Sequence, residues 1–169
     1  MDPGDELVDV VDEHDRVIDT VPRREIRERN LLHRCTYVLV RGSDGRFLVH
    51  RRTDTKDVYP GAYDVFAGGV LASGETYDAC AARELEEELG IADVPLERLF
   101  THRYSGPSGE AWGAVYEVTW DGPVVHQPSE VAWSGRVTLE HLDRMLATET
   151  FCLDSREIFE RWRAGRLGP

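Results

Sequence analysis

Residues 69–91 read GVLASGETYDACAARELEEELGI, a glycine-containing loop that leads into a stretch rich in alanine, leucine and glutamate. We expect one helix over residues 76–89. It should end at Gly90, because glycine readily adopts the left-handed conformation favoured just beyond a helix. The stretch therefore predicts a loop and a helix that follow each other directly.

The periodicity of this helix predicts two different faces. At about 100° per residue, apolar and acidic side chains separate onto roughly opposite flanks. The apolar flank carries Ala79, Ala82, Leu85 and Leu89, and the acidic flank carries Glu84, Glu87 and Glu88. Like charges three and four residues apart repel by roughly a few tenths of a kcal/mol per pair. The acidic flank therefore destabilises the helix unless a cation offsets the repulsion.

Carboxylates on adjacent helical turns suit a hard divalent cation. Mg²⁺ takes oxygen ligands at about 2.1 Å and keeps several waters, which leaves room for a substrate phosphate. Arg83 lies four residues before Glu87 and can hold one carboxylate in position. An isolated glutamate-rich helix is more often a solvated surface, so the inference depends on the residues before the helix.

Those residues complete a longer pattern. Gly68, Gly69 and Gly74 allow tight turns and offer carbonyl oxygens where side chains would obstruct a metal. Glu75 lies near the helix start, where negative charge complements the helix dipole. From Gly69 onward the fixed positions read G-x5-E-x7-R-E-U-x-E-E-x-G-U, with U apolar.

This pattern resembles the complete Nudix box. The resemblance implies an α/β/α sandwich with a mixed central sheet, in which the box forms a loop-helix-loop that holds Mg²⁺, or Mn²⁺ in its place. It implies that the metal-binding and catalytic carboxylates are Glu84, Glu87 and Glu88. It also implies a metal-ligand carbonyl at Gly68, an orienting role for Arg83, and structural roles for Gly69, Glu75 and Gly90.

The implied activity is Mg²⁺-dependent hydrolysis of a diphosphate linkage in a small nucleoside di- or triphosphate or related nucleoside-diphosphate compound. The metal would neutralise charge on the diphosphate and lower the pKa of a bound water, while a carboxylate removes the proton. Glu84 is a candidate for this base, and Glu110 and Glu130 are alternatives.

A wider resemblance covers residues 5–160. The run Leu31-Leu32-His33-Arg34 and the spacing Arg52-x3-Lys56-x3-Pro60-Gly61 are similar to the isopentenyl-diphosphate-isomerase-like branch of the family. This predicts that Arg52 and Lys56 bind the substrate diphosphate, with solvated surface charge as the alternative. The isomerases need a cysteine and a histidine in residues 63–69, and neither is present. Isomerase activity and non-catalytic nucleotide sensing remain as alternatives to hydrolysis.

Four other side chains are also candidates. His33 matches a metal-ligand histidine of the isomerases, although a structural histidine is the more common case. Tyr59, Tyr63 and Trp112 can stack on a nucleobase, an interaction worth about 1–3 kcal/mol, or can instead be buried in the core or in a dimer interface.

The rest of the chain predicts one domain over residues 1–169 with an N-terminal hairpin extension in residues 1–30. We expect the hairpin strands at residues 7–11 and 16–21, a charged segment at 23–29, and paired central strands at 35–41 and 47–50. After a long loop at 51–66 and the box, we expect strands at 96–104 and 111–120. Helices should start at Thr138 and at Asp154, the latter with a capping box to Glu157.

Composition excludes several classes of function. A formal net charge of −12 disfavours long nucleic acid, and no apolar stretch approaches the roughly 20 residues of a membrane span. The acidic first thirty residues do not form a secretory signal, and Cys35, Cys80 and Cys152 fit reduced thiols, so we expect a cytoplasmic protein. Its expected partner is a small-molecule diphosphate, and the protein is expected to be a monomer or a homodimer.

Overall fold

The computed structural model describes residues 2–166, which begin with an antiparallel hairpin. Its strands are β1 (Leu7–Val11) and β2 (Val17–Pro22), with the short helices η1 (Pro3–Asp5) before and α1 (Arg23–Glu28) after them. The predicted N-terminal hairpin is confirmed. The charged segment that follows is a helix that buries Ile26, and its 6 residues are too few for periodicity to reveal.

The main sheet is mixed. Its strands are β3 (His33–Arg41), β4 (Phe47–Arg52), β5 (Tyr63–Asp64), β6 (Phe66–Ala67), β7 (Glu97–Gly106), β8 (Gly109–Thr119) and β9 (Val131–Val137). In the described residues the strand order is β5-β4-β3-β8-β7. Outside this path, β6 pairs with β3 and β9 pairs with β4. β3 and β8 are parallel along their lengths, and the other strand pairs are antiparallel.

Strand pairing departs from the prediction around β4. Pairing of β3 with β4 is confined to the turn, where Arg41 lies opposite Phe47. The main partner of β4 is β9, which the sequence did not predict because Val131–Val137 is buried only at its two ends and shows no alternation. The expected loop at residues 51–66 also contains β5, so that prediction was wrong in part.

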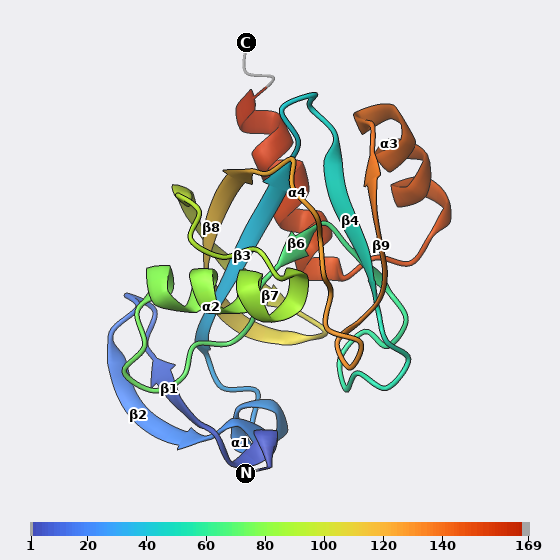
Figure 1. Ribbon diagram of the computed structural model, residues 1–169. Coiled ribbons are helices and arrows are strands. Elements are labelled where there is room, and N and C mark those ends of the chain that lie inside the picture. The colour runs from blue at the N-terminus through green and yellow to red at the C-terminus, as the bar shows by residue number, and fades with distance from the viewer. Residues whose placement is uncertain (1, 167–169) are drawn as a thin grey trace.

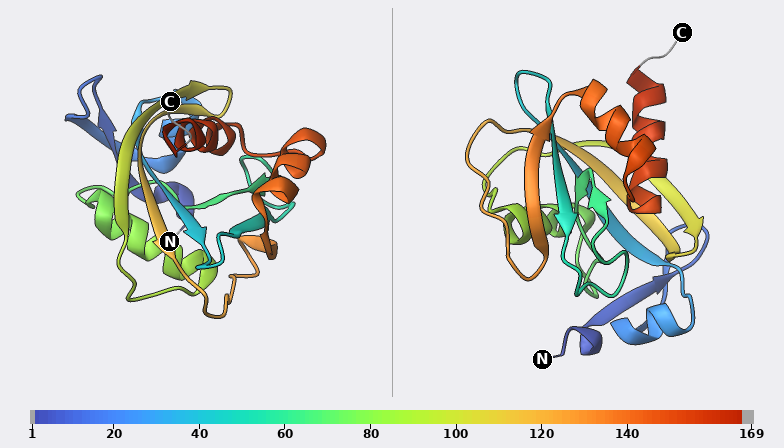
Figure 2. Two further views of the ribbon diagram at one scale, coloured as in Figure 1. Left: turned by 90° about the horizontal axis from the view of Figure 1, so that it is seen from above. Right: turned by 90° about the vertical axis from the view of Figure 1, so that its right-hand side faces the viewer.

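Helices cover both faces of the sheet. α2 (Tyr77–Leu89) lies on one face, and α3 (Leu139–Thr148) and α4 (Leu153–Arg166) lie on the other (Figure 1 and Figure 2). In the part of the chain that is described, no helix is long and apolar enough to cross a membrane. The predicted α/β/α sandwich is confirmed.

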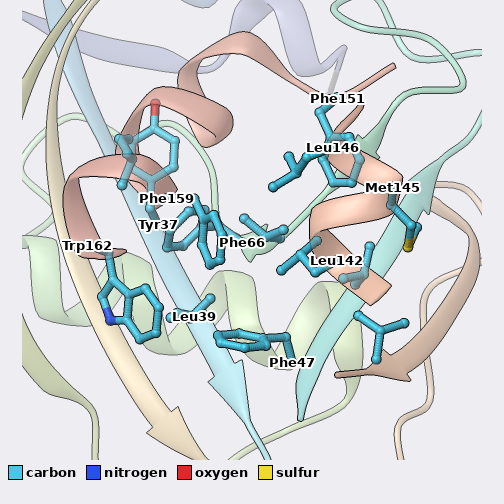
Figure 3. Close-up of a cluster of buried hydrophobic side chains, with 14 of the residues drawn as sticks. Tyr37, Leu39, Phe47, Phe66, Leu142, Met145, Leu146, Phe151, Phe159 and Trp162 are labelled. Atoms are coloured by element: carbon cyan, nitrogen blue, oxygen red, sulfur yellow. The ribbon is translucent and has the colours of Figure 1, made fainter. Parts of the chain in front are cut away.

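Alternate residues of β3 account for the two layers, because successive side chains of a strand point to opposite faces. Val38 and Val40 belong to the buried cluster of α2, whereas Tyr37 and Leu39 belong to the cluster under α3 and α4. Figure 3 shows this second cluster, in which Phe47 lies close to the two C-terminal helices.

The helix ends follow the sequence in two cases and not in the third. Gly90 has φ 66°, as predicted for the end of α2, and the helix begins one residue later than expected, with Thr76 as an N-cap that accepts a hydrogen bond from the Ala79 amide at 3.2 Å. Thr138 caps α3 in the same way. The predicted capping box of α4 is wrong, because Asp154 lies inside the helix and accepts a hydrogen bond from the Tyr37 hydroxyl at 2.9 Å.

The apolar flank predicted for α2 is half right. Leu85 and Leu89 are buried, but Ala79 and Ala82 are exposed. The alanine side chain is too small to determine which face is buried, so the two leucines set it. The buried set consists of Cys80, Ala81, Leu85, Glu88 and Leu89. As predicted, the three cysteines are free thiols.

Candidate active site

A cavity of about 450 Å³ is lined by α1, the loop after β4 and the acidic face of α2. Among the predicted site residues, those that line it are Arg52, Lys56, Gly68, Gly69, Arg83, Glu84, Glu87 and Glu88. The alternative candidates that also line it are His33, Tyr59, Glu110 and Glu130. In the described chain, Glu75, Gly90, Tyr63 and Trp112 lie outside its lining.

Two glycines let β3 and α2 approach the loop that joins β6 to α2. A Cβ atom on Gly68 would overlap the carbonyl oxygen of Thr36, and one on Gly69 would lie 2.5 Å from a carboxylate oxygen of Glu84. The Gly69 carbonyl accepts a hydrogen bond from the Thr36 amide at 2.9 Å. Glycine is therefore needed at both positions for the carboxylates to lie against the loop.

Arg83 is the centre of the carboxylate network. Its Nε donates to Glu75 at 2.8 Å, and its Nη1 donates to Glu84 at 2.7 Å and to Glu87 at 3.2 Å. Glu75 also accepts a hydrogen bond from the Ala72 amide at 2.9 Å, which ties the loop to the arginine. Arg83 thus brings Glu84 and Glu87 together at the cavity, as the sequence predicted. Its contact with Glu75 lies outside the cavity lining.

The three carboxylates of α2 differ in burial. Glu87 is exposed, whereas Glu88 is 6% exposed and accepts a hydrogen bond from the Gly68 amide at 3.1 Å. Burial and the neighbouring charge of Glu84 raise the pKa of Glu88 to about 8. Burial also raises the pKa of Glu84, against the opposing charge of Arg83.

The donor set fits a hard divalent cation. The charge of Glu84 raises the pKa of Glu88, and a cation that binds between neighbouring carboxylates offsets such repulsion. Within residues 2–166, however, no three acidic, histidine or cysteine groups already form a ligand shell. Oxygens of Glu84 and Glu87 are engaged by Arg83, so a bound metal has to share or displace these hydrogen bonds.

Basic side chains line the same cavity. Arg52 donates from Nε to the Val58 carbonyl at 3.1 Å, and Lys56 forms an ion pair with Glu130. Arg23 and Arg27 of α1 are further lining residues. The sequence placed these two arginines only in a charged segment, because no local pattern shows that the segment faces the box.

The remaining candidates fall into different surroundings. The Nδ1 of His33 is hydrogen-bonded to the Leu31 carbonyl at 2.9 Å, and burial lowers the pKa of this histidine. Trp112 donates to the Asp12 carbonyl at 3.3 Å, and so ties the N-terminal hairpin to the sheet. Tyr63 packs against Trp133 with ring centroids 6.1 Å apart. Only Tyr59 of the three predicted stacking residues lines the cavity, within the chain described.

Comparisons with known proteins agree with this geometry. A family model described as the NUDIX domain matches residues 31–161. An uncharacterized Nudix hydrolase of Streptomyces coelicolor is 45% identical over 173 residues, which cover 100% of this chain and 96% of the relative. Another from Pseudomonas aeruginosa is 40% identical over 150 residues, or 89% of each chain. The crystal structure of DR0079 from Deinococcus radiodurans has a TM-score of 0.81 at 29% identity and covers 92% of this chain and 98% of its own.

This chain therefore belongs to the Nudix family. The prediction of a Nudix hydrolase, made from the box in residues 69–91, is confirmed by these relatives. Members of this class act on small molecules and generally use a divalent metal.

Proposed function

We propose that this Nudix hydrolase cleaves the diphosphate linkage of a small nucleoside di- or triphosphate or a related nucleoside-diphosphate compound. The observation that carries the proposal is that one cavity is lined both by the three carboxylates of α2 and by several arginine and lysine side chains. Carboxylates suit a metal, and guanidinium and ammonium groups suit phosphate oxygens.

In this proposal Mg²⁺, for which Mn²⁺ can substitute, is held by Glu84, Glu87, Glu88 and the Gly68 carbonyl. When bound, it neutralises charge on the diphosphate and acidifies a water molecule. Arg83 positions Glu84 and Glu87 through its hydrogen bonds to both carboxylates. Gly69, Glu75 and Gly90 keep the loop and the end of α2 in the conformation that this arrangement needs.

The phosphate groups are bound by basic residues of two separate segments. Arg52 and Lys56 come from the loop after β4, and Arg23 comes from α1. The Nε of Arg23 is buried and has no hydrogen-bond partner among the described residues, so it is available to a ligand. Lys56 reaches a phosphate by sharing or leaving its contact with Glu130.

Hydrolysis requires a base for the attacking water. The water oxygen forms a bond to phosphorus, the bridging P–O bond breaks, and the leaving phosphate takes the electron pair. We propose that Glu84, whose pKa is raised by burial, accepts the proton of the water. Hydrogen bonds from Ser105 and Arg103 instead lower the pKa of Glu110, which makes it the weaker base.

We further propose that the N-terminal extension and the box work as one domain. Asp9 of β1 accepts hydrogen bonds from the Ser73 hydroxyl at 2.6 Å and from the Gly74 amide at 3.0 Å. These bonds join the hairpin to the loop that precedes α2.

The proposal is tested by phosphate and pyrophosphate release from nucleoside di- and triphosphates, nucleotide sugars and dinucleoside polyphosphates with Mg²⁺. We expect Glu87→Gln to lower kcat by at least about 100-fold, because it removes one charged metal ligand. Glu86→Gln, on the exposed side of the same helix, is the matched control and should keep wild-type turnover.

Full turnover in Glu87→Gln would overturn the assignment of the acidic face. A wild-type protein that is stabilised by nucleotides but releases no phosphate would instead be a sensor. Conversion of a prenyl diphosphate without phosphate release would identify an isomerase.

A further inference from the structure

Besides the Nε of Arg23, two buried polar atoms in the lining of the cavity lack hydrogen-bond partners among the described residues. They are Oδ1 of Asp154 and the hydroxyl oxygen of Tyr59, and neither has a partner among the described residues. Most buried polar groups in proteins are hydrogen-bonded, since an unpaired one costs about 1–3 kcal/mol. Two such atoms in one cavity indicate a place where a ligand completes the hydrogen bonding.

The carboxylate of Asp154 is held in position by its neighbours. Its other oxygen, Oδ2, accepts a hydrogen bond from the Tyr37 hydroxyl at 2.9 Å. The next residue, Ser155, donates to buried Asp64 at 2.6 Å, which fixes the start of α4 against β5. Asp154 therefore presents one engaged oxygen and one unengaged oxygen in a fixed orientation.

Tyr59 lies in the same loop as the phosphate-binding candidate Lys56. Its φ of 51° is in the left-handed region, which is strained for a tyrosine, and such strain is concentrated at ligand sites. Burial raises the pKa of Tyr59 most, the neighbouring hydroxyls of Ser108 and Tyr104 act in opposite directions, and the charge of Asp154 adds a smaller increase, so the phenol keeps its proton. The two unpaired groups thus lie within electrostatic reach of each other.

These groups belong to the same space as the carboxylates of α2. Cys35 lines the cavity, and its thiol pKa is raised by burial first, then by the charge of Asp154, with a smaller contribution from Glu84. Because Glu84, Cys35 and Asp154 line one cavity, a ligand whose phosphates lie at Glu84 can extend toward Asp154. The cavity volume of about 450 Å³ is within the range of small-molecule sites.

We infer that Asp154 and Tyr59 form the subsite for the organic part of the substrate, and that this part is a nucleoside. An N–H or O–H group of its base or ribose donates to Oδ1 of Asp154, and Tyr59 supplies a second polar contact. This inference rests on the proposed hydrolysis of a diphosphate at the same cavity. A prenyl chain fits poorly, because it would cover the Asp154 oxygen without offering a hydrogen-bond donor.

Binding without turnover tests the subsite separately from the reaction. AMP, CMP, GMP and UMP are titrated individually by calorimetry in EDTA, so that no metal links the phosphate to the protein. We expect at least one to bind the wild type, and Asp154→Asn to raise its Kd by about 10- to 100-fold, as for a lost bond to a charged group. Asp143→Asn, which removes a carboxylate that is paired with Arg163 and is not among the lining residues of the cavity, should leave Kd unchanged.

Tyr59→Phe provides a second variant that leaves the charge of the cavity intact. We expect it to raise the same Kd by about 3- to 10-fold. It also keeps the inference falsifiable if Asp154→Asn does not fold, which near-ultraviolet circular dichroism reports. The inference is overturned if no nucleotide binds the wild type, or if every folded variant binds as the wild type does.

Kinetics with Mg²⁺ then separate the two proposals. For the best nucleoside substrate, Asp154→Asn should raise KM with little change in kcat, whereas hydrolysis of inorganic tripolyphosphate should be unaffected. Equal turnover of geranyl diphosphate and the nucleoside substrate would overturn the subsite. If the wild type hydrolyses nothing but nucleotide binding still depends on Asp154, the proposed hydrolysis fails and the subsite stands.

Discussion

At the scale of single residues, the site depends on how closely backbone and carboxylates approach each other. Gly68 lies against the Thr36 carbonyl of β3, and its amide donates to Glu88. Gly69 faces the carboxylate of Glu84. A side chain at either position would push the loop away from β3 or from α2.

Gly68→Ala is expected to destabilise the protein by at least about 2 kcal/mol, because its Cβ overlaps backbone that has no free space to move. Urea unfolding measures the change. Gly165→Ala in α4 is the control, since a Cβ there meets no atom within 4 Å and alanine favours the helix by about 0.5–1 kcal/mol. Equal stability of the two variants would contradict the proposed contact.

The site residues that belong to the box could be predicted from the sequence, whereas most of the cavity residues from other segments could not. Arg83, Glu84 and Glu87 lie within one helical turn or so, and local spacing alone brings them together. Arg23 and Asp154 are distant in sequence, and only the folded sheet places both at the cavity. The sequence suggested an ordinary helix cap at Asp154, and no local signal indicates its contact with Tyr37.

At the scale of elements, α2 buries the carboxylate of Glu88, although an amphipathic helix on a sheet normally exposes its acidic side chains. Glu88 lies among the buried residues that hold the helix to the sheet. In the unfolded chain it loses its proton near its ordinary pKa, whereas in the folded protein its pKa is about 8. Between these values the folded state binds more protons, so stability falls as pH rises.

We therefore expect deprotonation of Glu88 to lower the free energy of unfolding in EDTA by about 2–3 kcal/mol between about pH 6 and pH 8.5. Glu88→Gln should remove most of this dependence, and Glu86→Gln on the exposed side should retain it. Urea unfolding at the two pH values measures the difference. A pH dependence that is unchanged in Glu88→Gln would show that other groups cause it.

Elements differ in how much of their position is encoded locally. α2 has a cap, a terminating glycine and strong leucines, so the sequence predicts it closely. β9 has neither alternation nor a clear boundary and is specified by its pairing with β4. α1 is short, and packing of Ile26 with β1 and β2 stabilises it rather than any periodic pattern.

At the scale of the whole molecule, the N-terminal hairpin is fastened to the box loop by one carboxylate. Burial acts to raise the pKa of Asp9, but hydrogen bonds from Ser73, Gly74 and Thr20 outweigh it and lower the pKa. Arg27 of α1 also pairs with Asp57 at 2.5 Å, which joins the extension to the loop after β4. The extension thus contacts both segments that line the cavity.

Asp9→Asn should loosen this attachment, because an amide cannot accept all of these hydrogen bonds. We expect the amides of β1 and β2 to exchange with deuterium about tenfold faster, with little change in the core of the sheet. Asp19→Asn on β2 is the matched control, since the Asp19 side chain is exposed and, among residues 2–166, accepts a hydrogen bond only from the Thr20 amide. Uniform exchange rates across the three proteins would show that Asp9 does not fasten the hairpin.

The parallel pairing of β3 with β8 also determines when the chain can fold during its synthesis. The box, α2 and β7 all lie between these two strands, so β3 is made long before its partner. Contacts between such distant segments form slowly, and an unpaired apolar strand is prone to aggregate. Val38 and Leu39, completely buried in the finished protein, can pair with β6 early, but their parallel partners Tyr116 and Glu117 leave the ribosome only after the box, α2 and β7.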